Sequence, residues 1–384
     1  MRIAVVAHEM EGRRTGVGRY LEGLLEGLVS LSSGAGSSGI ELELFFKGDP
    51  FSHPLWNSGA PVKTHFDGRP SAHTVLWEQR RLPRLLRKST CDLFFSPAYS
   101  LPPLPRGMRS MVTVHDLSFE LLGHEFSWRE RWRRRFLARL AVRRASRVLA
   151  DTTTIAQQLE RLYRVPAQRL AVVPLGIDEK FLEVGQEAED VKAVTECGVE
   201  EPYILFLGSI LARRHLDLVI AAFAAVEKEH PRLRLVIAGA NRLRMPGDLE
   251  DWIGASGVAD RIIRLGYVAE EMLPALYRRA ELSYYLSSYE GYGLPPLESL
   301  AAGTPAVVGR GLALDDLWLD YPYRCSSLEK NQVVEQTKRA LADSAERTLI
   351  GAEGRQRMAK LSWQHAAELF LGEAQRAVAY EGEK

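Results

Sequence analysis

Two doubly wound α/β domains in tandem are the architecture that this chain of 384 residues predicts. The length exceeds what one hydrophobic core usually covers, so two domains of about 150–200 residues are expected. Strand-like apolar runs alternate with helical patterns along the chain, and this alternation restarts once near the middle. No repeat of about 20–50 residues is visible. The pattern therefore favours two sheets with crossover helices over a single barrel.

The elements fall into two series. Strands are predicted at 3–8, 41–46, 92–97, 110–116, 147–152 and 170–176, with a helix at 17–31. The second series has strands at 203–209, 233–239 and 261–268 and helices at 216–230, 248–257 and 270–280. The polar stretch 178–199 lacks a strand signal and separates the series. We therefore expect domains at 1–178 and 179–364, followed by a helix at 365–384.

The composition narrows the class of partner. The 50 basic and 49 acidic residues give a net charge of +1, so no overall excess of charge demands nucleic acid. The three cysteines, Cys91, Cys197 and Cys325, lie far apart in the sequence and indicate reduced residues of a cytoplasmic protein. The start "MRIAVVAHEM" predicts a first strand rather than a signal peptide. No run of 18 apolar residues predicts a membrane span.

The segment "SSYEGYGLPPLESLAAGTPAVV" (287–308) contains the most informative candidate site. Gly291 and Gly293 allow left-handed backbone angles, and the proline pair that follows suits the first turn of a helix. Amides at such a helix start bind phosphate, whereas Glu290, before it, and Glu298, expected in its first turn, would rather face hydroxyl groups. Phosphate and hydroxyls together describe a nucleotide sugar. A capped loop with a helix-favouring acid is the alternative.

Further candidates follow predicted strands, where doubly wound sheets bind ligands. Gly16 and Gly18 precede the first long helix and would bring backbone amides near a ligand, although a plain turn also explains them. Leu21 takes the third glycine position, so a dinucleotide fingerprint is not predicted. His115 ends a strand and can donate to a sugar hydroxyl, and a packed, hydrogen-bonded histidine is the alternative.

Two cations follow the first strand of the second series, at Arg213 and Arg214. Their guanidinium groups can grip a diphosphate bidentately and stabilise the charge that builds up when a nucleoside diphosphate departs. A solvated loop is the alternative. The sequence has no H-E-x-x-H, C-x-x-C or G-x-S-x-G motif, so we predict neither a metal site nor a nucleophile elbow.

A basic segment at 126–147 carries nine arginines. Trp128, Trp132 and Phe136 follow one another at four-residue spacing, which predicts an amphipathic helix at 127–147. Such a helix could rest on an anionic membrane surface. The alternative is a surface helix whose aromatic residues pack on the domain while arginine stems cover apolar surface. No base-reading motif accompanies it, so nucleic acid is not expected as a partner.

Taken together, these stretches resemble the retaining glycosyltransferases of family 4, which have the two-domain GT-B fold. The resemblance covers nearly the whole chain. It rests on "TGVGRYL" (15–21), "VTVHDLSFE" (112–120), "YILFLGSILARRHLDLVIAAFAAV" (203–226) and the E-x7-E signature in "YEGYGLPPLESLAAGTPAVV" (289–308). "LSW" (361–363) is similar to the element that leads the last helix back onto the first domain.

The resemblance implies a role for each matched residue. Glu290 would lie beside the hydroxyls of the transferred sugar, Glu298 would hold the ribose and His115 would contact the sugar. Arg213 and Arg214 would act with Glu290 and His115 in catalysis. The donor would be bound by Gly16, Gly18, Gly208, Arg213, Arg214, Glu290, Gly291, Tyr292, Gly293, Leu294 and Glu298. Neither a metal nor another cofactor is implied. The chain departs from the family at Arg213-Arg214-His215, where Arg-Lys-Asn is usual, and in the stretch 309–323.

The implied activity is transfer of a hexose, with retention, from a nucleoside-diphosphate sugar to an acceptor hydroxyl. The domain at 1–178 would bind the acceptor, a glycan or a lipid-linked molecule of cell-surface polysaccharide or glycolipid assembly. The domain at 179–364 would bind the donor, with GDP-mannose as first candidate and UDP-glucose as second. We expect a cytoplasmic protein that could meet the inner face of the membrane. A nucleotide-sugar epimerase of the same architecture and a non-catalytic nucleotide-sugar-binding module are the alternatives.

Overall fold

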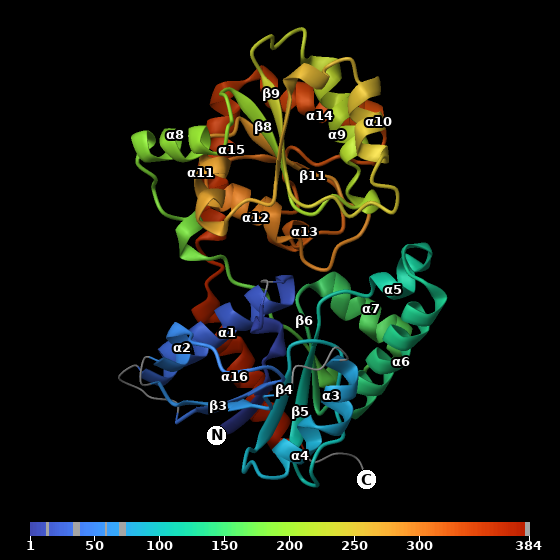
Figure 1. The fold of residues 1–384 in the computed structure, drawn as a ribbon, viewed down its shortest axis with the longest axis vertical. Helices are drawn as coiled ribbons and strands as arrows, with labels where there is room; N and C mark the ends of the chain where they lie inside the picture. The colour runs from blue at the N-terminus through green and yellow to red at the C-terminus, as the bar shows by residue number, and fades with distance from the viewer. Residues whose placement is uncertain (13–14, 34–38, 58–59, 69–73, 381–384) are drawn as a thin grey trace. The chain divides into compact units, whose positions relative to one another are not determined.

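The computed structural model describes residues 1–12, 15–33, 39–57, 60–68 and 74–380. It consists of two compact units. Unit 1 comprises Met1–Gly176 and Leu361–Lys384, and unit 2 comprises Ile177–Lys360. The chain thus leaves unit 1 once and returns to it for its last helix, drawn in red among the blue and green elements in Figure 1.

Among the described residues, unit 1 holds a seven-stranded sheet with the order β3-β2-β1-β4-β5-β6-β7. Its strands are β1 (Arg2–Val6), β2 (Glu41–Phe46), β3 (Val62–Phe66), β4 (Leu93–Ser96), β5 (Arg109–Val114), β6 (Arg147–Ala150) and β7 (Leu170–Val172). All neighbouring strands run parallel. The strand order reverses between β1 and β4, so the switch point of this sheet lies at their carboxyl ends.

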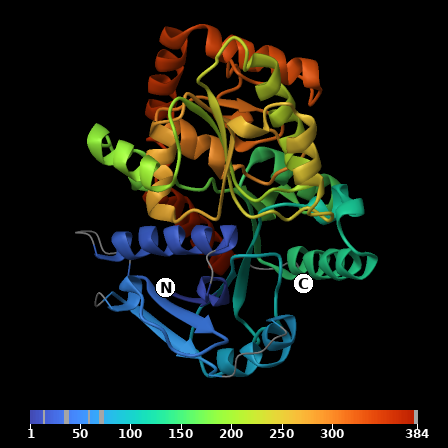
Figure 2. The same cartoon turned by 45° about the horizontal axis from the view of Figure 1, so that its top comes forward.

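Helices cover the strands of unit 1, as Figure 2 shows for α1 beside the blue strands. They are α1 (Gly16–Ser33), α2 (Pro54–Asn57), α3 (Thr74–Arg80), α4 (Leu82–Leu86), α5 (Ser118–Leu121), α6 (Trp128–Arg144), α7 (Thr153–Tyr163) and α16 (Trp363–Ala379). The central strands β4 and β6 are buried along their whole length, which is usual where helices cover both faces of a parallel sheet. β3 was not predicted from the sequence, and none of its residues is fully buried.

The last helix packs against the first. α16 contacts α1 and the strands β4, β5 and β6. A Cβ atom at Gly23 or Gly27 of α1, or at Gly176, would overlap Trp363, so these glycines leave the space that this residue occupies. The helix expected at 365–384 begins two residues earlier and ends at Ala379. The last four positions of that prediction, 381–384, lie outside the described residues.

The basic segment forms α6, whose N-cap residue Ser127 accepts a hydrogen bond from the amide of Glu130. The helix ends at Arg144. Arg147 lies in β6 instead, where it is buried and forms an ion pair with Glu373 of α16. The predicted helix at 127–147 was therefore too long at its C-terminal end, because the sheet takes up the arginine beyond the cap.

Unit 2 holds a five-stranded parallel sheet in the described residues, in the order β10-β9-β8-β11-β12. Its strands are β8 (Tyr203–Leu207), β9 (Arg234–Ala238), β10 (Ile262–Gly266), β11 (Leu282–Tyr285) and β12 (Ala306–Val308). From β8 the chain builds outward through β9 and β10, then crosses to the other side for β11 and β12. The switch point of this sheet therefore lies at the carboxyl ends of β8 and β11.

The helices of unit 2 are α8 (Glu187–Glu196), α9 (Leu216–Val226), α10 (Asp248–Ala255), α11 (Leu273–Arg278), α12 (Leu294–Ala301), α13 (Ala313–Leu317), α14 (Lys330–Ala342) and α15 (Ser344–Met358). α8 forms within the polar stretch that the sequence analysis treated as a separator. Its buried residues are Asp190 and Val194. Arg278 of α11 donates to both carboxylate oxygens of Asp190, from Nε to Oδ2 at 2.7 Å and from Nη2 to Oδ1 at 2.6 Å, which fixes α8 against α11.

Candidate active site

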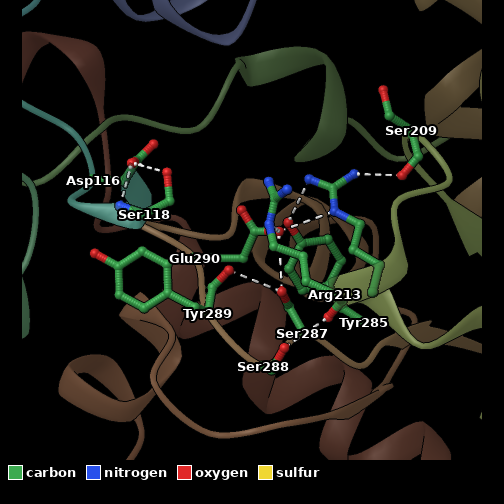
Figure 3. A network of polar contacts seen from close by, with 10 residues as sticks. Asp116, Ser118, Ser209, Arg213, Tyr285, Ser287, Ser288, Tyr289 and Glu290 are labelled. Carbon is green, nitrogen blue, oxygen red and sulfur yellow. Dashed lines mark hydrogen bonds and ion pairs between the residues drawn. The ribbon is translucent and has the colours of Figure 1, made fainter. Parts of the chain in front are cut away.

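The switch point of unit 2 gathers the charged candidates. Arg213 and Arg214 lie in a short 3₁₀ turn, Ala212–Arg214, after β8, and Glu290 lies in the loop after β11. Because β8 and β11 are neighbouring parallel strands, their carboxyl ends meet at one edge of the sheet. The structure brings these three side chains together there (Figure 3). The arrangement is what a doubly wound sheet offers a ligand.

Arg214 is fixed by three hydrogen bonds that it donates. Its Nε reaches Glu290 Oε1 at 3.0 Å, Nη2 reaches the Tyr285 hydroxyl at 3.0 Å, and Nη1 reaches the Ser209 carbonyl at 3.1 Å. The guanidinium carbon also lies 5.1 Å from the centre of the Tyr285 ring. Partners at the ends of both strands therefore hold this cation in one orientation.

Glu290 is the centre of the cluster. Besides Arg214, its Oε1 atom accepts from Ser287 Oγ at 3.2 Å and lies 3.7 Å from Arg213 Nε. The Arg213 carbonyl accepts from the backbone amide of Ser288 at 2.9 Å, which ties the two loops together. One carboxylate oxygen thus faces two guanidinium groups, and all three charged side chains are at most 20% exposed.

Burial and neighbouring charge shift the pKa values of Arg214 and Tyr285. Burial alone lowers the pKa of Arg214, but its contacts with Tyr285 and Glu290 outweigh burial, and its pKa is raised. Burial, together with the negative charge of Glu290, raises the pKa of the Tyr285 hydroxyl far above its ordinary value of 10.0. Arg214 is therefore a permanent cation and Tyr285 a permanent neutral donor or acceptor.

Gly208 leaves room for this cation. It follows β8 with φ of 129°, an angle that side-chain-bearing residues rarely adopt. A Cβ atom there would lie 2.6 Å from Arg214 Nη1. The backbone angle therefore favours glycine at this position. The absence of a side chain at Gly208 also leaves the space that the Arg214 guanidinium occupies.

The turn ahead of the next helix also tolerates few residues. His215 takes the left-handed conformation with φ of 48° and is the N-cap residue of α9. Asn and His are among the residues enriched in this region. His215, which stands where the family usually has Asn, is therefore compatible with a left-handed backbone at this position.

The loop before α12 has the expected glycine conformation at one of two positions. Gly293 is left-handed with φ of 83° and is the N-cap residue of α12, whereas Gly291 is not left-handed. The helix accordingly begins at Leu294, ahead of the proline pair. Glu298 therefore lies in the second turn, and its expected place in the first turn was wrong. It is 1% exposed, and Tyr292 in the preceding loop is also buried.

The two glycines of unit 1 have different surroundings. Gly16 begins α1, is exposed, and has no atom within 4 Å of a Cβ built on it. Gly18 is buried, and a Cβ there would lie 2.5 Å from the Glu9 carbonyl. Its amide donates to Thr15 Oγ1 at 2.9 Å, and the Thr15 hydroxyl in turn lies 3.1 Å from the Glu9 carboxylate. The close contact at Gly18 therefore explains why this position is a glycine. No such contact explains Gly16, and its role in binding a ligand stays a prediction.

His115 follows β5 and has a partner at each ring nitrogen. Nδ1 lies 2.6 Å from the Asp151 carboxylate, and Nε2 donates to the Pro97 carbonyl at 2.7 Å. Burial alone would lower the pKa of His115, but the charge and hydrogen bond of Asp151 raise it above its ordinary value of 6.5. These contacts are those of the packed, hydrogen-bonded histidine that was the alternative. A hydrogen bond to a sugar stays a prediction, and it would replace the bond to Pro97.

Sequence reasoning missed the polar group at the switch point of unit 1. His8, which follows β1, has its Nε2 atom 3.5 Å from Glu9 and 3.6 Å from Glu78. Glu78 is 6% exposed, and burial raises its pKa although Ser100, beyond β4, donates to it at 2.5 Å. The available signal for this group was His8, a polar residue close behind the first strand. Nothing in the sequence around Glu78 on α3 indicated that it would join the group.

The described part of the chain has neither a candidate metal cluster nor a candidate membrane span. In residues 1–12, 15–33, 39–57, 60–68 and 74–380 no group of three or more His, Cys, Asp or Glu side chains could hold a metal ion. Within those same ranges, no helix has the length and apolar character needed to cross a bilayer.

Family models match both halves of the chain. The model described as "Glycosyltransferase Family 4" matches residues 14–181, and "Glycosyl transferases group 1" matches residues 188–360. The chain is 29% identical over 206 residues to mannosylfructose-phosphate synthase of Agrobacterium fabrum, a match that spans 52% of this chain and only 45% of that relative. It is 25% identical over 301 residues to O-antigen chain mannosyltransferase B of Escherichia coli, which covers 76% of each chain.

Solved structures share the fold at low identity. Sucrose-phosphate synthase from Thermosynechococcus elongatus superposes with a TM-score of 0.74 at 19% identity, covering 98% of this chain and 99% of that one. HepE of Anabaena, solved with UDP and glucose, has a TM-score of 0.73 at 14% identity, with the same coverage. The predicted GT-B fold of two parallel α/β domains is thereby confirmed. With matching models over both halves, the chain belongs to the family 4 glycosyltransferases.

Proposed function

We propose that this glycosyltransferase moves a hexose from a nucleoside-diphosphate sugar to an acceptor hydroxyl with retention, and that it needs no divalent metal for the chemistry. The acceptor would be a glycan or a lipid-linked molecule of cell-surface polysaccharide or glycolipid assembly. Mannose is the first candidate sugar, because two relatives are named for mannosyl products or transfer. UDP-glucose is the second candidate donor, because HepE was solved with UDP and glucose.

The cluster of Arg213, Arg214 and Glu290 is the observation that carries this proposal. Two guanidinium groups at a switch point, that of Arg214 held by three hydrogen bonds, suit a diphosphate, since arginine can donate parallel hydrogen bonds to phosphate oxygens. In a half-buried site, the attraction between these cations and a phosphate is stronger than it would be in water. Glu290, held between them, would face the hydroxyls of the sugar.

The proposed reaction breaks the bond between the sugar's anomeric carbon and the diphosphate oxygen. The acceptor oxygen attacks the same face and forms the new bond, while its proton passes to the departing phosphate. Arg213 and Arg214 would stabilise the negative charge that develops on that leaving oxygen. Glu290 would fix the sugar and oppose the positive charge of its oxocarbenium-like transition state.

Donor identity can be tested by thermal unfolding with UDP-glucose, GDP-mannose and the ADP- and dTDP-linked hexoses. A donor at about 100 times its dissociation constant should add roughly 2.7 kcal/mol to the free energy of unfolding. Transfer is then measured with that donor and octyl glycosides as acceptors, and proton NMR gives the anomeric configuration of the product. Retention of the donor's α configuration is expected.

A matched pair of variants separates catalysis from folding. Glu290→Gln should lower turnover by about a hundredfold or more, as loss of a transition-state contact typically does. Glu200→Gln removes the exposed partner of Arg234 in the same unit and should leave turnover unchanged. An inverted product would refute retention, and release of a 2-epimer without a glycoside would favour the epimerase. Unchanged turnover in Glu290→Gln would remove Glu290 from the site.

A further inference from the structure

We propose that one face of α6 docks on the surface of an anionic phospholipid bilayer. The α6 face consists of the exposed residues along this helix, Trp128, Arg129, Trp132, Arg133, Phe136, Arg139, Arg143 and Arg144. In both views α6 lies at the periphery of unit 1 (Figure 1, Figure 2). None of the residues of this face belongs to the cluster of Arg213, Arg214 and Glu290.

The aromatic residues of the α6 face do not pack on the domain. Trp128 is 75% exposed, Trp132 66% and Phe136 53%, although the sequence also allowed all three to be buried against unit 1. Trp132 and Phe136 stack on each other with ring centres 5.5 Å apart and planes within 7°. The helix instead uses the small residues Ala138 and Ala141 on its buried side. Three large aromatic side chains on successive turns form an exposed apolar patch, which indicates an interaction site.

The arginines of α6 divide into two groups. Those next to the domain have partners within it: Arg134 pairs with Glu130, Arg135 pairs with Glu120, and Arg131 donates to the carbonyls of residues 119 and 120. The arginines of the α6 face are exposed, and the Arg129 guanidinium carbon lies 5.3 Å from the centre of the Trp128 ring. Arg139 also contacts the domain, because its guanidinium carbon lies 5.6 Å from the centre of the Tyr163 ring. Cations and tryptophans on one exposed face are typical of helices that lie in the interface of a bilayer.

Charge also favours lipid over a second copy of the chain. The α6 face contains arginines and no acidic residue, so two such faces would repel each other in a symmetric dimer. Anionic headgroups provide the complementary charge, and each arginine near such a surface strengthens the binding. Tryptophan and phenylalanine rings would then enter the region between headgroups and acyl chains.

Flotation with vesicles tests this surface. The full-length protein is mixed with vesicles of phosphatidylcholine alone or with 30% phosphatidylglycerol, and the bound fraction is measured at low and high salt. We expect binding to the anionic vesicles, weakened by salt, and little binding to the neutral ones. Brominated lipids should quench Trp128 and Trp132, because these are the tryptophans that are exposed. Absence of binding to anionic vesicles would refute the proposal.

Two variants and two controls locate the contact. Arg129→Gln/Arg133→Gln/Arg143→Gln should weaken vesicle binding by about a hundredfold, given the usual worth of one basic residue at a charged surface. Trp128→Ala/Trp132→Ala should weaken it and abolish the quenching. Lys228→Gln/Arg232→Gln/Arg242→Gln changes three exposed charges of unit 2, and Tyr267→Ala/Leu319→Ala changes two of its exposed apolar residues. Both controls should bind like the original chain.

Other results would contradict the proposal in distinct ways. Equal binding of all variants would place the contact elsewhere. A dimer that Trp128→Ala/Trp132→Ala dissociates would make the α6 face an interface between copies. Tight, salt-dependent binding of a duplex oligonucleotide, lost in the arginine variant while vesicle binding is kept, would assign the arginines to nucleic acid.

Discussion

Arg214 and His115 show how single residues are held at the two candidate positions. Arg214 donates to groups at the ends of two neighbouring strands, and His115 bridges Pro97 and Asp151, which follow two others. In both cases a charged group is fixed by partners that are distant in sequence. Side chains restrained in this way lose little entropy when a ligand binds.

Gly208→Ala should displace Arg214, and it should also lower the free energy of unfolding of unit 2, because φ at this position is 129°. The new methyl group would lie 2.6 Å from Nη1, and the guanidinium would have to move. We expect the affinity for a nucleoside diphosphate to fall at least about tenfold, which corresponds to one lost charge-assisted hydrogen bond. Titration calorimetry measures it. Gly247→Ala is the control, since no atom lies within 4 Å of a Cβ there; equal affinities in the two variants would contradict the role of Gly208.

His115 should titrate above its ordinary pKa of 6.5. Because the folded pKa is raised, the pair with Asp151 stabilises the fold fully below about pH 6.5, and this stabilisation is lost as the pH rises through the folded pKa. NMR titration of labelled histidine measures the folded pKa directly. Asp151→Asn keeps the shape and removes the charge, so it should lower that pKa. A pKa that does not change in Asp151→Asn would show that the carboxylate has no such effect.

At the scale of elements, helix ends and strand ends bring the candidates together. α12 begins one residue after the left-handed Gly293, and α1 begins at Gly16. The 3₁₀ turn with Arg213 and Arg214 follows β8 directly. Glycines at these junctions set the direction of the chain and leave space for neighbouring side chains, so their substitution should have effects that depend on position.

Gly23→Ala should destabilise unit 1, because a Cβ there would overlap the ring of Trp363. Overpacking of this kind costs about 1–3 kcal/mol. Gly372→Ala is a matched control in α16, where no atom lies within 4 Å of the new Cβ, and it should stabilise by about 0.5–1 kcal/mol. Urea unfolding measures both. Destabilisation by both variants, or by neither, would contradict the packing of Trp363 against α1.

The sequence predicted the elements whose apolar pattern is strong. Both β/α series and the glycine turn at Gly293 were visible, because each depends on neighbouring residues. The ion pair between Arg214 and Glu290 was not predicted, because the two residues are 76 positions apart. β3 was missed because its residues are only half-buried, and α8 because it packs through an ion pair rather than an apolar stripe. The partner of His115 and the exposure of Trp128 depend on residues far away in sequence, so no local pattern could predict them.

At the scale of the whole molecule, each unit has its own parallel sheet with a switch point. In unit 1 the switch point lies beyond β1 and β4, where Ser100 donates a hydrogen bond to Glu78 and His8 lies 3.6 Å from the same carboxylate. In unit 2 it lies beyond β8 and β11, where the arginines face Glu290. The last helix returns to unit 1, so both ends of the chain contribute to one core.

The central claim is that Arg213 and Arg214 bind the diphosphate of a nucleotide sugar. Calorimetry with UDP, GDP and the corresponding nucleosides, on the original chain and on Arg214→Ala and Arg214→Lys, tests it most directly. Circular dichroism confirms folding, and Arg234→Ala, whose ion pair lies on the surface of the same unit, is the control. We predict that one diphosphate binds much more tightly than its nucleoside. This preference should fall about 10–100-fold in Arg214→Ala, partly recover in Arg214→Lys and stay unchanged in Arg234→Ala. Diphosphates that bind no better than nucleosides, or equally well to Arg214→Ala, would contradict the claim.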